Sequence, residues 1–369
     1  MKIDGYNHFG GKSTDLGALK NVLAFNGVVA PHTGQPYTEE MLLGIGGGIG
    51  VIYFTFVFDD MHTMYVGTRD VRMSGKPSYI QSAVERIGGG FKVQETAGAK
   101  SAEANLRAAI EAGQPAITWL DLASLPYSGF PPELTKYYEH IAVVFGLEAG
   151  KAHIGDRAST SLVITEDELA RSRAAITSQK HRIVTVAPPR DGADLRAGII
   201  AGINDCVRGM LQPPITNFGL KGLEKWADRL TNKKDKQGWP TVFPRGGYLL
   251  DALQATYTCI ELWGTGGHAG RGMYANFLGE AGAATENPDL EAVAGEYRHT
   301  AELWSHIAES ALPDEVPLFR EGKELLAKRD RLFLEQGDAS TAECQEITRR
   351  LTAMREQANE DFPLSQTEI

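Results

Sequence analysis

The sequence has few cysteines. Its 369 residues include Cys206, Cys259 and Cys344, and none of the first 205 residues is a cysteine. These three are far apart and form neither a Cys-x-x-Cys pair nor a cysteine–histidine spacing typical of zinc sites. The pattern therefore predicts free thiols in a reducing compartment, as in a cytoplasmic protein, and no cysteine-bound metal.

Positive charge is also scarce. Lysine and arginine number 37 against 47 aspartates and glutamates, which gives a formal net charge of -10. No basic stripe could displace counterions from phosphates, so nucleic acid is excluded as a partner. The longest apolar run, residues 51–58, has the length of a strand and is far short of the roughly 20 residues of a membrane span. We expect no signal peptide and no membrane partner.

Two glycine-rich stretches fall short of nucleotide-binding motifs. Residues 10–14 look like the end of a phosphate-binding loop, but the motif needs a glycine at the position of Tyr6, and Gly5 is one residue off. Residues 44–50 follow a predicted helix and lack the strand–turn–helix context of a dinucleotide site. Close backbone packing is our interpretation of these glycines. The sequence predicts no cofactor and no metal.

Hydrophobic periodicity predicts an α+β unit in the first half. Apolar side chains recur at helical spacing over residues 14–25, where Ser13 or Thr14 could cap the start and Gly27 ends the pattern. The remaining helices are predicted from residue 38 and over 78–87 and 101–112. Strands are predicted over 51–58, 65–66, 116–120, 140–147 and 152–156.

Beyond Thr165 the pattern is helical almost throughout. The predicted organisation is an acyl-transfer-type domain over 1–164, a helical connector over 165–215, a helical domain over 216–335 and a C-terminal amphipathic helix with its tail over 336–369. The last helix carries an apolar stripe at Ile347, Leu351, Met354 and Ala358. We expect this stripe to pack against the chain's own body; a dimer seam is the alternative.

Three residues point to acyl-transfer chemistry. Thr14 starts a helix, His140 begins a strand and Asp156 ends the next one, in the chain order of the nucleophile, general base and orienting residue of papain-like enzymes. A helix N-terminus favours negative charge on a nucleophile. His8 lies six residues before Thr14, at the offset of a second donor to an oxyanion. These four residues are the predicted catalytic group.

A set of segments spread over most of the chain carries a family likeness. These are 14–27, 43–50, 67–69, 113–115, 121–122, 125–127, 217–220, 264–267 and 277–278, with Trp226, Arg271, Tyr274 and Trp304. In these segments the sequence resembles butirosin biosynthesis protein H and its relatives, in which a cysteine occupies the position of Thr14. The resemblance implies a papain-like N-terminal domain, a helical second domain, and transfer of amino-acid units from carrier-protein thioesters in natural-product (antibiotic) biosynthesis.

Thr14 leaves the mechanism open. A thiol with a pKa of about 8.5 can be held as a thiolate beside a histidine, whereas an alcohol must lose its proton during the attack. Thr14 or Ser13 could be a slower nucleophile. Alternatively, His140 could deprotonate a bound amine so that a ring closes, as in a cyclase or an eliminating enzyme. Thr14 could also be only a helix cap, or the protein a non-catalytic module that binds a carrier or another partner.

Further residues are predicted to bind substrate. Arg69 could hold a carboxylate or phosphate through two hydrogen bonds, or it could only brace the domain. Ser13, Asp59 and Tyr127 complete this group. Residues 266–268 with Arg271 could bind an anion, or the glycines could serve close packing. The predicted partners are an acyl or amino-group carrier protein and a small-molecule amine or amino acid; a homodimer or a hetero-complex is possible.

Overall fold

The computed structural model describes residues 1–58, 61–67, 78–131, 134–189 and 194–365. The chain divides into two compact units, each assembled from three separate stretches of sequence. The first unit comprises Met1–Leu42, Ile80–Gly198 and Arg329–Thr348, and the second comprises Leu43–Tyr79, Ile199–Lys328 and Arg349–Ile369. The predicted boundary after residue 164 lies inside the first unit. Five helices contain a boundary: α2 (Glu39–Gly46), α3 (Tyr79–Arg86), α6 (Leu195–Leu211), α12 (Pro317–Gln336) and α13 (Thr341–Glu360).

The described part of the first unit contains a six-stranded antiparallel sheet. Its order is β3-β8-β4-β5-β6-β7. Helix α1 (Thr14–Phe25) packs against β5, whereas α4 (Ala99–Glu111) and α5 (Glu166–Ala175) both contact β4. The strands are β3 (Gly90–Gln94), β4 (Ala116–Asp121), β5 (Glu139–Glu148), β6 (Lys151–Gly155), β7 (Leu162–Thr165) and β8 (Ile183–Ala187).

The α+β class predicted for this half is confirmed, and α1 has the predicted bounds. Three strands were not predicted: β3, β7 and β8. Strand β8 lies between β3 and β4, so it interrupts the helical pattern expected after Thr165 and brings part of the predicted connector into the sheet. Its first four residues are buried, and Ala187 at its end is exposed.

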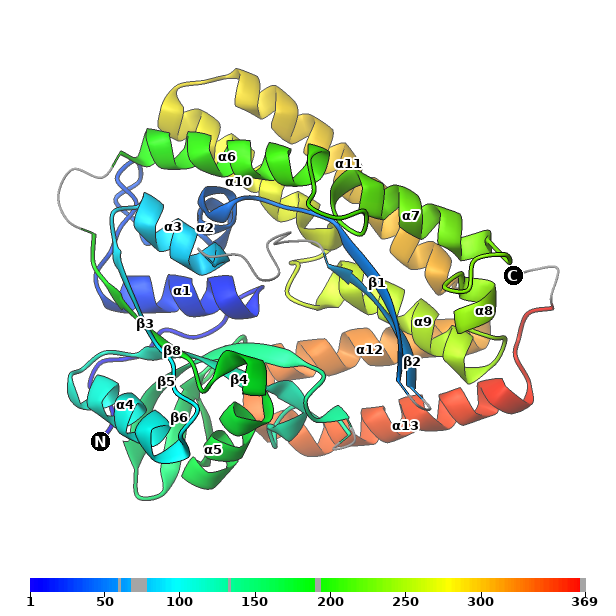
Figure 1. The fold of residues 1–369 in the computed structure, drawn as a ribbon, viewed down its shortest axis with the longest axis horizontal. Coiled ribbons are helices and arrows are strands. Elements are labelled where there is room, and N and C mark those ends of the chain that lie inside the picture. The colour runs from blue at the N-terminus through cyan, green and yellow to red at the C-terminus, as the bar shows by residue number, and fades with distance from the viewer. Residues whose placement is uncertain (59–60, 68–77, 132–133, 190–193, 366–369) are drawn as a thin grey trace. The chain divides into compact units, whose positions relative to one another are not determined.

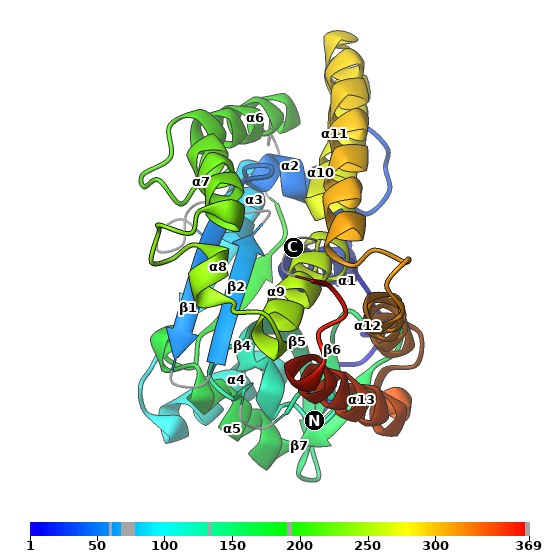
Figure 2. The ribbon, with the colours of Figure 1, turned by 90° about the vertical axis from the view of Figure 1, so that its right-hand side faces the viewer.

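The second unit is built from helices and one hairpin. Strands β1 (Ile52–Phe58) and β2 (Met61–Gly67) form a separate two-stranded antiparallel ribbon (Figure 1). Helix α7 packs against β1 and α9 against β2, and α10 runs beside α11 (Figure 2). The helices that lie wholly in this unit are α7 (Gly219–Thr231), α8 (Trp239–Val242), α9 (Gly247–Tyr257), α10 (Arg271–Thr285) and α11 (Asp289–Ala311).

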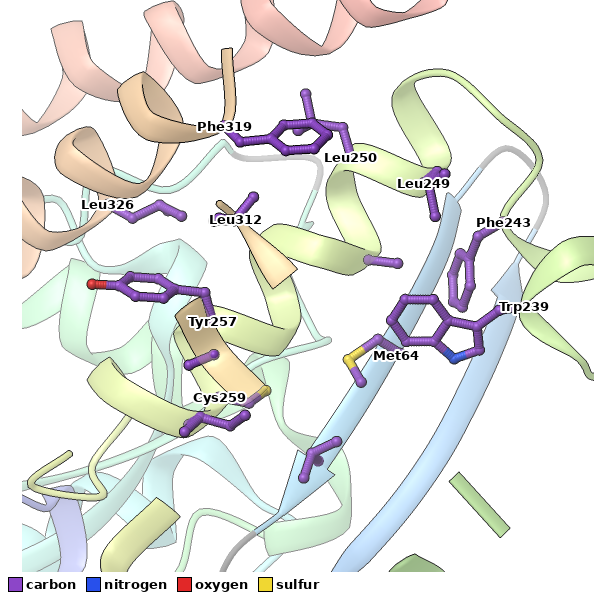
Figure 3. Close-up of a cluster of buried hydrophobic side chains, with 14 of the residues drawn as sticks. Met64, Trp239, Phe243, Leu249, Leu250, Tyr257, Cys259, Leu312, Phe319 and Leu326 are labelled. Atoms are coloured by element: carbon purple, nitrogen blue, oxygen red, sulfur yellow. The ribbon is translucent and has the colours of Figure 1, made fainter. Parts of the chain in front are cut away.

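A hydrophobic core holds the second unit together. Figure 3 shows Trp239 and Phe243 beside Met64 of β2, with Leu249 of α9 near Phe243 and Leu250 on the other side of the cluster. All five of these side chains are buried. At about 25 cal/mol for each Å² of apolar surface removed from water, a cluster of this kind is the main stabilising contribution to the unit.

The glycines of residues 44–50 serve close packing, as predicted. A Cβ atom on Gly44 would lie 2.1 Å from the ring of Phe277. Gly48 has a φ of +74°, and a Cβ there would lie 2.7 Å from Cys206. Neither position accepts a side chain without moving its neighbour, so the glycines let the backbone approach the helices that follow.

The C-terminal stripe packs inside the chain. Ile347, Met354 and Ala358 are all buried, and the last two belong to the core of the second unit. The predicted packing of α13 against the chain's own body is therefore confirmed. Cys206, Cys259 and Cys344 are buried free thiols.

Among the helices of the described ranges, none is both long enough and apolar enough to cross a membrane.

Candidate functional site

The β5–β6 hairpin brings His140 and Asp156 together. His140 is at the start of β5, and Asp156 directly follows the end of β6. Because the strands are antiparallel and Val143 pairs with Gly155, the start of one strand lies beside the end of the other. A two-residue turn at 149–150, with positive φ at both residues, closes the hairpin. The spacing of 16 residues between the two side chains is thus set by local structure.

A buried chain of hydrogen bonds joins three side chains here. His140 Nε2 lies 2.6 Å from Asp156 Oδ2, and the Tyr127 hydroxyl donates to the same oxygen at 3.0 Å. The backbone N–H of Arg157 donates to Asp156 Oδ1 at 2.6 Å. The Asp156 side chain is fully buried and that of His140 is 7% exposed. The carboxylate is therefore held from both of its oxygens.

These partners keep Asp156 ionised. Burial alone would raise the pKa of Asp156, but the charge and hydrogen bond of His140, the Arg157 amide and the Tyr127 hydroxyl together lower this pKa below its usual value. Burial, with the neighbouring charge of Asp156, raises the pKa of Tyr127 well above its usual value. Tyr127 therefore stays protonated and remains a donor.

The aspartate also fixes the orientation of the imidazole. A carboxylate can only accept, so Nε2 of His140 carries a proton in this contact. Among the described residues, Nδ1 of His140 makes no hydrogen bond. This atom is not completely buried. Nδ1 is thus the ring nitrogen that can accept a proton.

The N-terminal segment leads from the sheet to α1. The Ile3 amide donates to the Phe145 carbonyl of β5 at 2.9 Å, and the Gly10 amide donates to the Asp156 carbonyl at 3.1 Å. The side-chain amide of Asn21, on α1, donates to the Gly10 carbonyl at 2.9 Å. These bonds bring the start of α1 to the end of the sheet where Asp156 lies.

Thr14 is the first helical residue of α1, and Ser13 takes the N-cap position. Ser13 does not cap in the usual way, because its hydroxyl donates to the Asp15 carboxylate at 2.5 Å. No hydrogen bond from the amide or the hydroxyl of Thr14 is found among the described residues, and its side chain is partly exposed. The geometry therefore gives Thr14 no capping role.

Glu39 is a site neighbour that the sequence analysis missed. Its buried carboxylate accepts hydrogen bonds from the amides of Lys12, at 3.1 and 3.0 Å, and of Ser13, at 3.0 Å. The ammonium group of Lys20 lies 3.7 Å from Glu39 Oε2. Glu39 fixes the loop that leads into Thr14. A helix-starting Glu39 is an ordinary sequence feature, and only the folded loop gives it this role.

The first turn of α1 is in electrostatic contact with the start of β5. Desolvation raises the pKa of the Glu139 carboxyl, and the negative charge of Asp15 adds to that rise. Glu139 is the residue before His140 in β5. Asp15 also accepts the Leu16 amide at 2.9 Å. Thr14 and His140 are thus on elements that pack against each other, α1 and β5.

The other predicted site residues have different positions. Ser13 is fully buried and Tyr127 is 2% exposed, so neither can touch a substrate directly; Tyr127 instead positions Asp156. His8 is partly exposed, and its ring contacts the ring of Tyr6. His8 lies two residues before Gly10, whose amide donates to the Asp156 carbonyl. Asp59 and Arg69 lie outside the described residues.

Arg271 is a structural brace. It is 2% exposed, donates to the carbonyls of Ala269 at 2.7 Å and Gly50 at 2.9 Å, and stacks over Trp304 at 4.3 Å. Burial lowers the pKa of Arg271 to about 10. Because its guanidinium donates to carbonyl oxygens in the interior, Arg271 is not placed to bind an anion.

Removal of the Tyr127 hydroxyl should loosen Asp156. Tyr127→Phe keeps the stacking of the ring on Phe333, at 5.7 Å, and deletes one hydrogen bond to a buried carboxylate. We expect a loss of about 1.5–3 kcal/mol in the free energy of unfolding, the range for hydrogen bonds to charged groups. Urea unfolding measures it, with Tyr137→Phe, at a 51% exposed tyrosine, as the control. Equal stability of the two variants would contradict this assignment.

Two family models match the chain. The model described as butirosin biosynthesis protein H, N-terminal, matches residues 14–157, a segment that begins at Thr14 and contains His140 and Asp156. The model described as a domain of unknown function (DUF4872) matches residues 167–317. A search of curated proteins found no match. Residues 14–157 are thus similar to the N-terminal part of the butirosin biosynthesis protein H family.

Proposed function

We propose that the protein is a biosynthetic enzyme of natural-product, butirosin-type antibiotic assembly that transfers an aminoacyl group from a carrier protein to an amine. The proposal rests on the buried chain Tyr127–Asp156–His140, which leaves Nδ1 of His140 free to accept a proton. The first unit would then be a papain-like domain. The matched family model agrees with this reading, because its name refers to an antibiotic-biosynthesis protein.

In this mechanism Thr14 is the nucleophile. Its hydroxyl loses a proton to His140 Nδ1 as the oxygen attacks the thioester carbonyl; the carrier thiol leaves with that proton, and an acyl-enzyme ester forms. The amide of Thr14 has no partner among the described residues and, as the first helical N–H, could donate to the oxyanion. An incoming amine then attacks the ester, and the Thr14 hydroxyl is restored.

Ring closure without a covalent intermediate is the second candidate, and the carboxylates near Thr14 favour it. Asp15 and Glu39 accept hydrogen bonds from amides in and just before the first turn of α1. Their negative charges oppose a developing alkoxide or oxyanion and attract an ammonium group. In this reaction His140 takes a proton from the substrate's amine, the nitrogen bonds to an electrophilic carbon of the same molecule, and a leaving group departs from that carbon.

Intact-mass measurement distinguishes the candidates. The protein is incubated with a carrier protein that bears an amino acid as a thioester, with and without a free amine. An acyl adduct on the enzyme, followed by an amide product, supports acyl transfer. Loss of the leaving group's mass from the carrier-bound residue, with no enzyme adduct, supports ring closure. If carriers loaded with each of the common amino acids remain unchanged, both candidates fail and a binding module becomes the better interpretation.

A further inference from the structure

A second hydrogen-bonded group of titratable side chains lies in the second unit. Glu261 is on the π-helical turn η4 (Thr258–Leu262), His268 starts the short helix η5 (His268–Gly270), and Ser305 is on α11. His268 Nδ1 lies 2.7 Å from Ser305 Oγ, and Ser305 Oγ donates to Glu261 Oε1 at 2.6 Å. The amide of His268 donates to Glu261 Oε2 at 3.2 Å. These contacts form a closed hydrogen-bonded network that joins η4, η5 and α11.

The donors and acceptors in this hydrogen-bonded network fix the tautomer of His268. The serine hydroxyl has one proton, which it gives to a carboxylate oxygen that can only accept. Ser305 Oγ must then accept from His268, so Nδ1 carries the imidazole proton. In the neutral ring, Nε2 holds the lone pair. No hydrogen bond to Nε2 of His268 is found among the described residues, and the residue is exposed.

The backbone around this hydrogen-bonded network is strained. His268 and Ala269 have φ values of +56° and +54°, which side-chain-bearing residues rarely adopt. Such a backbone conformation is unfavourable and persists only where surrounding contacts hold it. Here the Glu261 carboxylate holds the His268 amide, and Arg271 holds the Ala269 carbonyl. A π-helical turn at Glu261 adds a second irregularity of the kind often found at functional sites.

Packing does not account for this arrangement. A loop shaped only to fill the interior would bury its histidine, yet His268 is exposed while the next residue, Ala269, is fully buried. His299 is also exposed and lies on α11. Among the described residues, it contacts the Glu302 carboxylate at 3.4 Å and makes no hydrogen bond to a serine like that of His268. The strained backbone, the π-helical turn and the hydrogen bonds of Glu261 and Ser305 together fix the orientation of one imidazole.

We propose that His268 is a second catalytic residue, a general base whose Nε2 takes a proton from a substrate O–H or N–H group. Glu261 and Ser305 are positioning residues that hold the tautomer. In the step, Nε2 gains the substrate's proton and the substrate oxygen or nitrogen becomes a nucleophile. Nδ1 keeps its proton, and the carboxylate of Glu261 stabilises the imidazolium through Ser305. The site lies within residues 167–317, the segment matched as a domain of unknown function, and does not depend on Thr14 or His140.

Nitrogen NMR tests the tautomer in the full chain. With ¹⁵N-labelled histidine, the nine histidines give separate long-range correlations, and His268→Gln assigns one set. We expect that set to show the Nδ1–H tautomer at a pH where the ring is neutral, and Ser305→Ala to shift it towards Nε2–H. An Nε2–H tautomer in the wild-type protein would overturn the proposal. If Ser305→Ala fails to fold, Glu261→Gln provides the same comparison.

Ester hydrolysis tests the reactivity of Nε2 without a natural substrate. The probe is p-nitrophenyl acetate in a His140→Gln background, which removes the other candidate base. Water gives a proton to Nε2 while its oxygen adds to the ester carbonyl, and acetate and p-nitrophenol are released. We expect loss of most of the enzyme-dependent rate with His268→Gln or Ser305→Ala, and no loss with His299→Gln. Equal loss in all three variants, or no loss in any, would contradict the proposal. Neither the NMR measurement nor the ester hydrolysis uses a carrier protein. Failure of the proposed function therefore leaves the test of His268 unaffected.

Discussion

Replacement of His140 by alanine should lower turnover by about a hundredfold or more, the usual contribution of a general base. His140 presents a free Nδ1 because Asp156 holds its other nitrogen at 2.6 Å, and both proposed reactions need that atom to accept a proton. The measurement is steady-state turnover of the loaded carrier. A folded His140 variant within a few-fold of wild type would remove this residue from the mechanism.

Folding must be controlled in this experiment. Alanine leaves Asp156 as a buried charge without its main partner, which costs about 3–5 kcal/mol in comparable pairs. His140→Gln retains a side-chain N–H for the carboxylate and is therefore the better variant. His153→Ala is the matched control, because His153 lies on the same hairpin and bonds a carboxylate, Glu148, at 3.1 Å. We expect that control to keep its turnover.

The hairpin shows why part of the site could be predicted. The apolar run of β5 and the alternating apolar residues of β6 are local signals, and an antiparallel pair with a short turn places the first residues of one strand beside the end of the next. His140 and Asp156 could therefore be paired from the sequence. Helix α1 was equally clear, because its apolar residues repeat at helical spacing and Gly27 follows it with a φ of +70°.

Weak local signals and non-local contacts explain much of what was missed. Strand β7 has four residues and runs directly into α5, so it offers too few positions for a period of two. Strand β3 is largely exposed and carries little apolar signal. The role of Glu39 depends on the amides of Lys12 and Ser13, 26 or more residues earlier in the chain. Nothing local in the sequence encodes such a contact, just as nothing local marks units built from three separate stretches.

Replacement of Thr14 separates the mechanisms. Under acyl transfer, Thr14→Ala should abolish turnover and the acyl adduct, and Thr14→Ser should retain both. Thr14→Cys should remain active or gain, because a thiol at the same helix start ionises more readily than an alcohol. Under ring closure, Thr14→Ala should lower the rate modestly through a lost positioning contact, and no variant should carry an adduct. Intact mass and turnover on the same samples decide between the two.

The stability of Thr14→Ala tests the remaining possibility, that Thr14 only caps the helix. Thr165 provides the comparison: its hydroxyl accepts the Glu168 amide at 3.1 Å and forms a complete capping box at the start of α5. Thr165→Ala should lose about 1 kcal/mol in the free energy of unfolding and keep its turnover. Thr14→Ala should do the reverse, because Thr14 is the first helical residue and no described residue bonds its hydroxyl. If Thr14→Ala instead loses stability like Thr165→Ala and keeps full activity, Thr14 has no part in the chemistry, and His140 must act directly on a bound substrate.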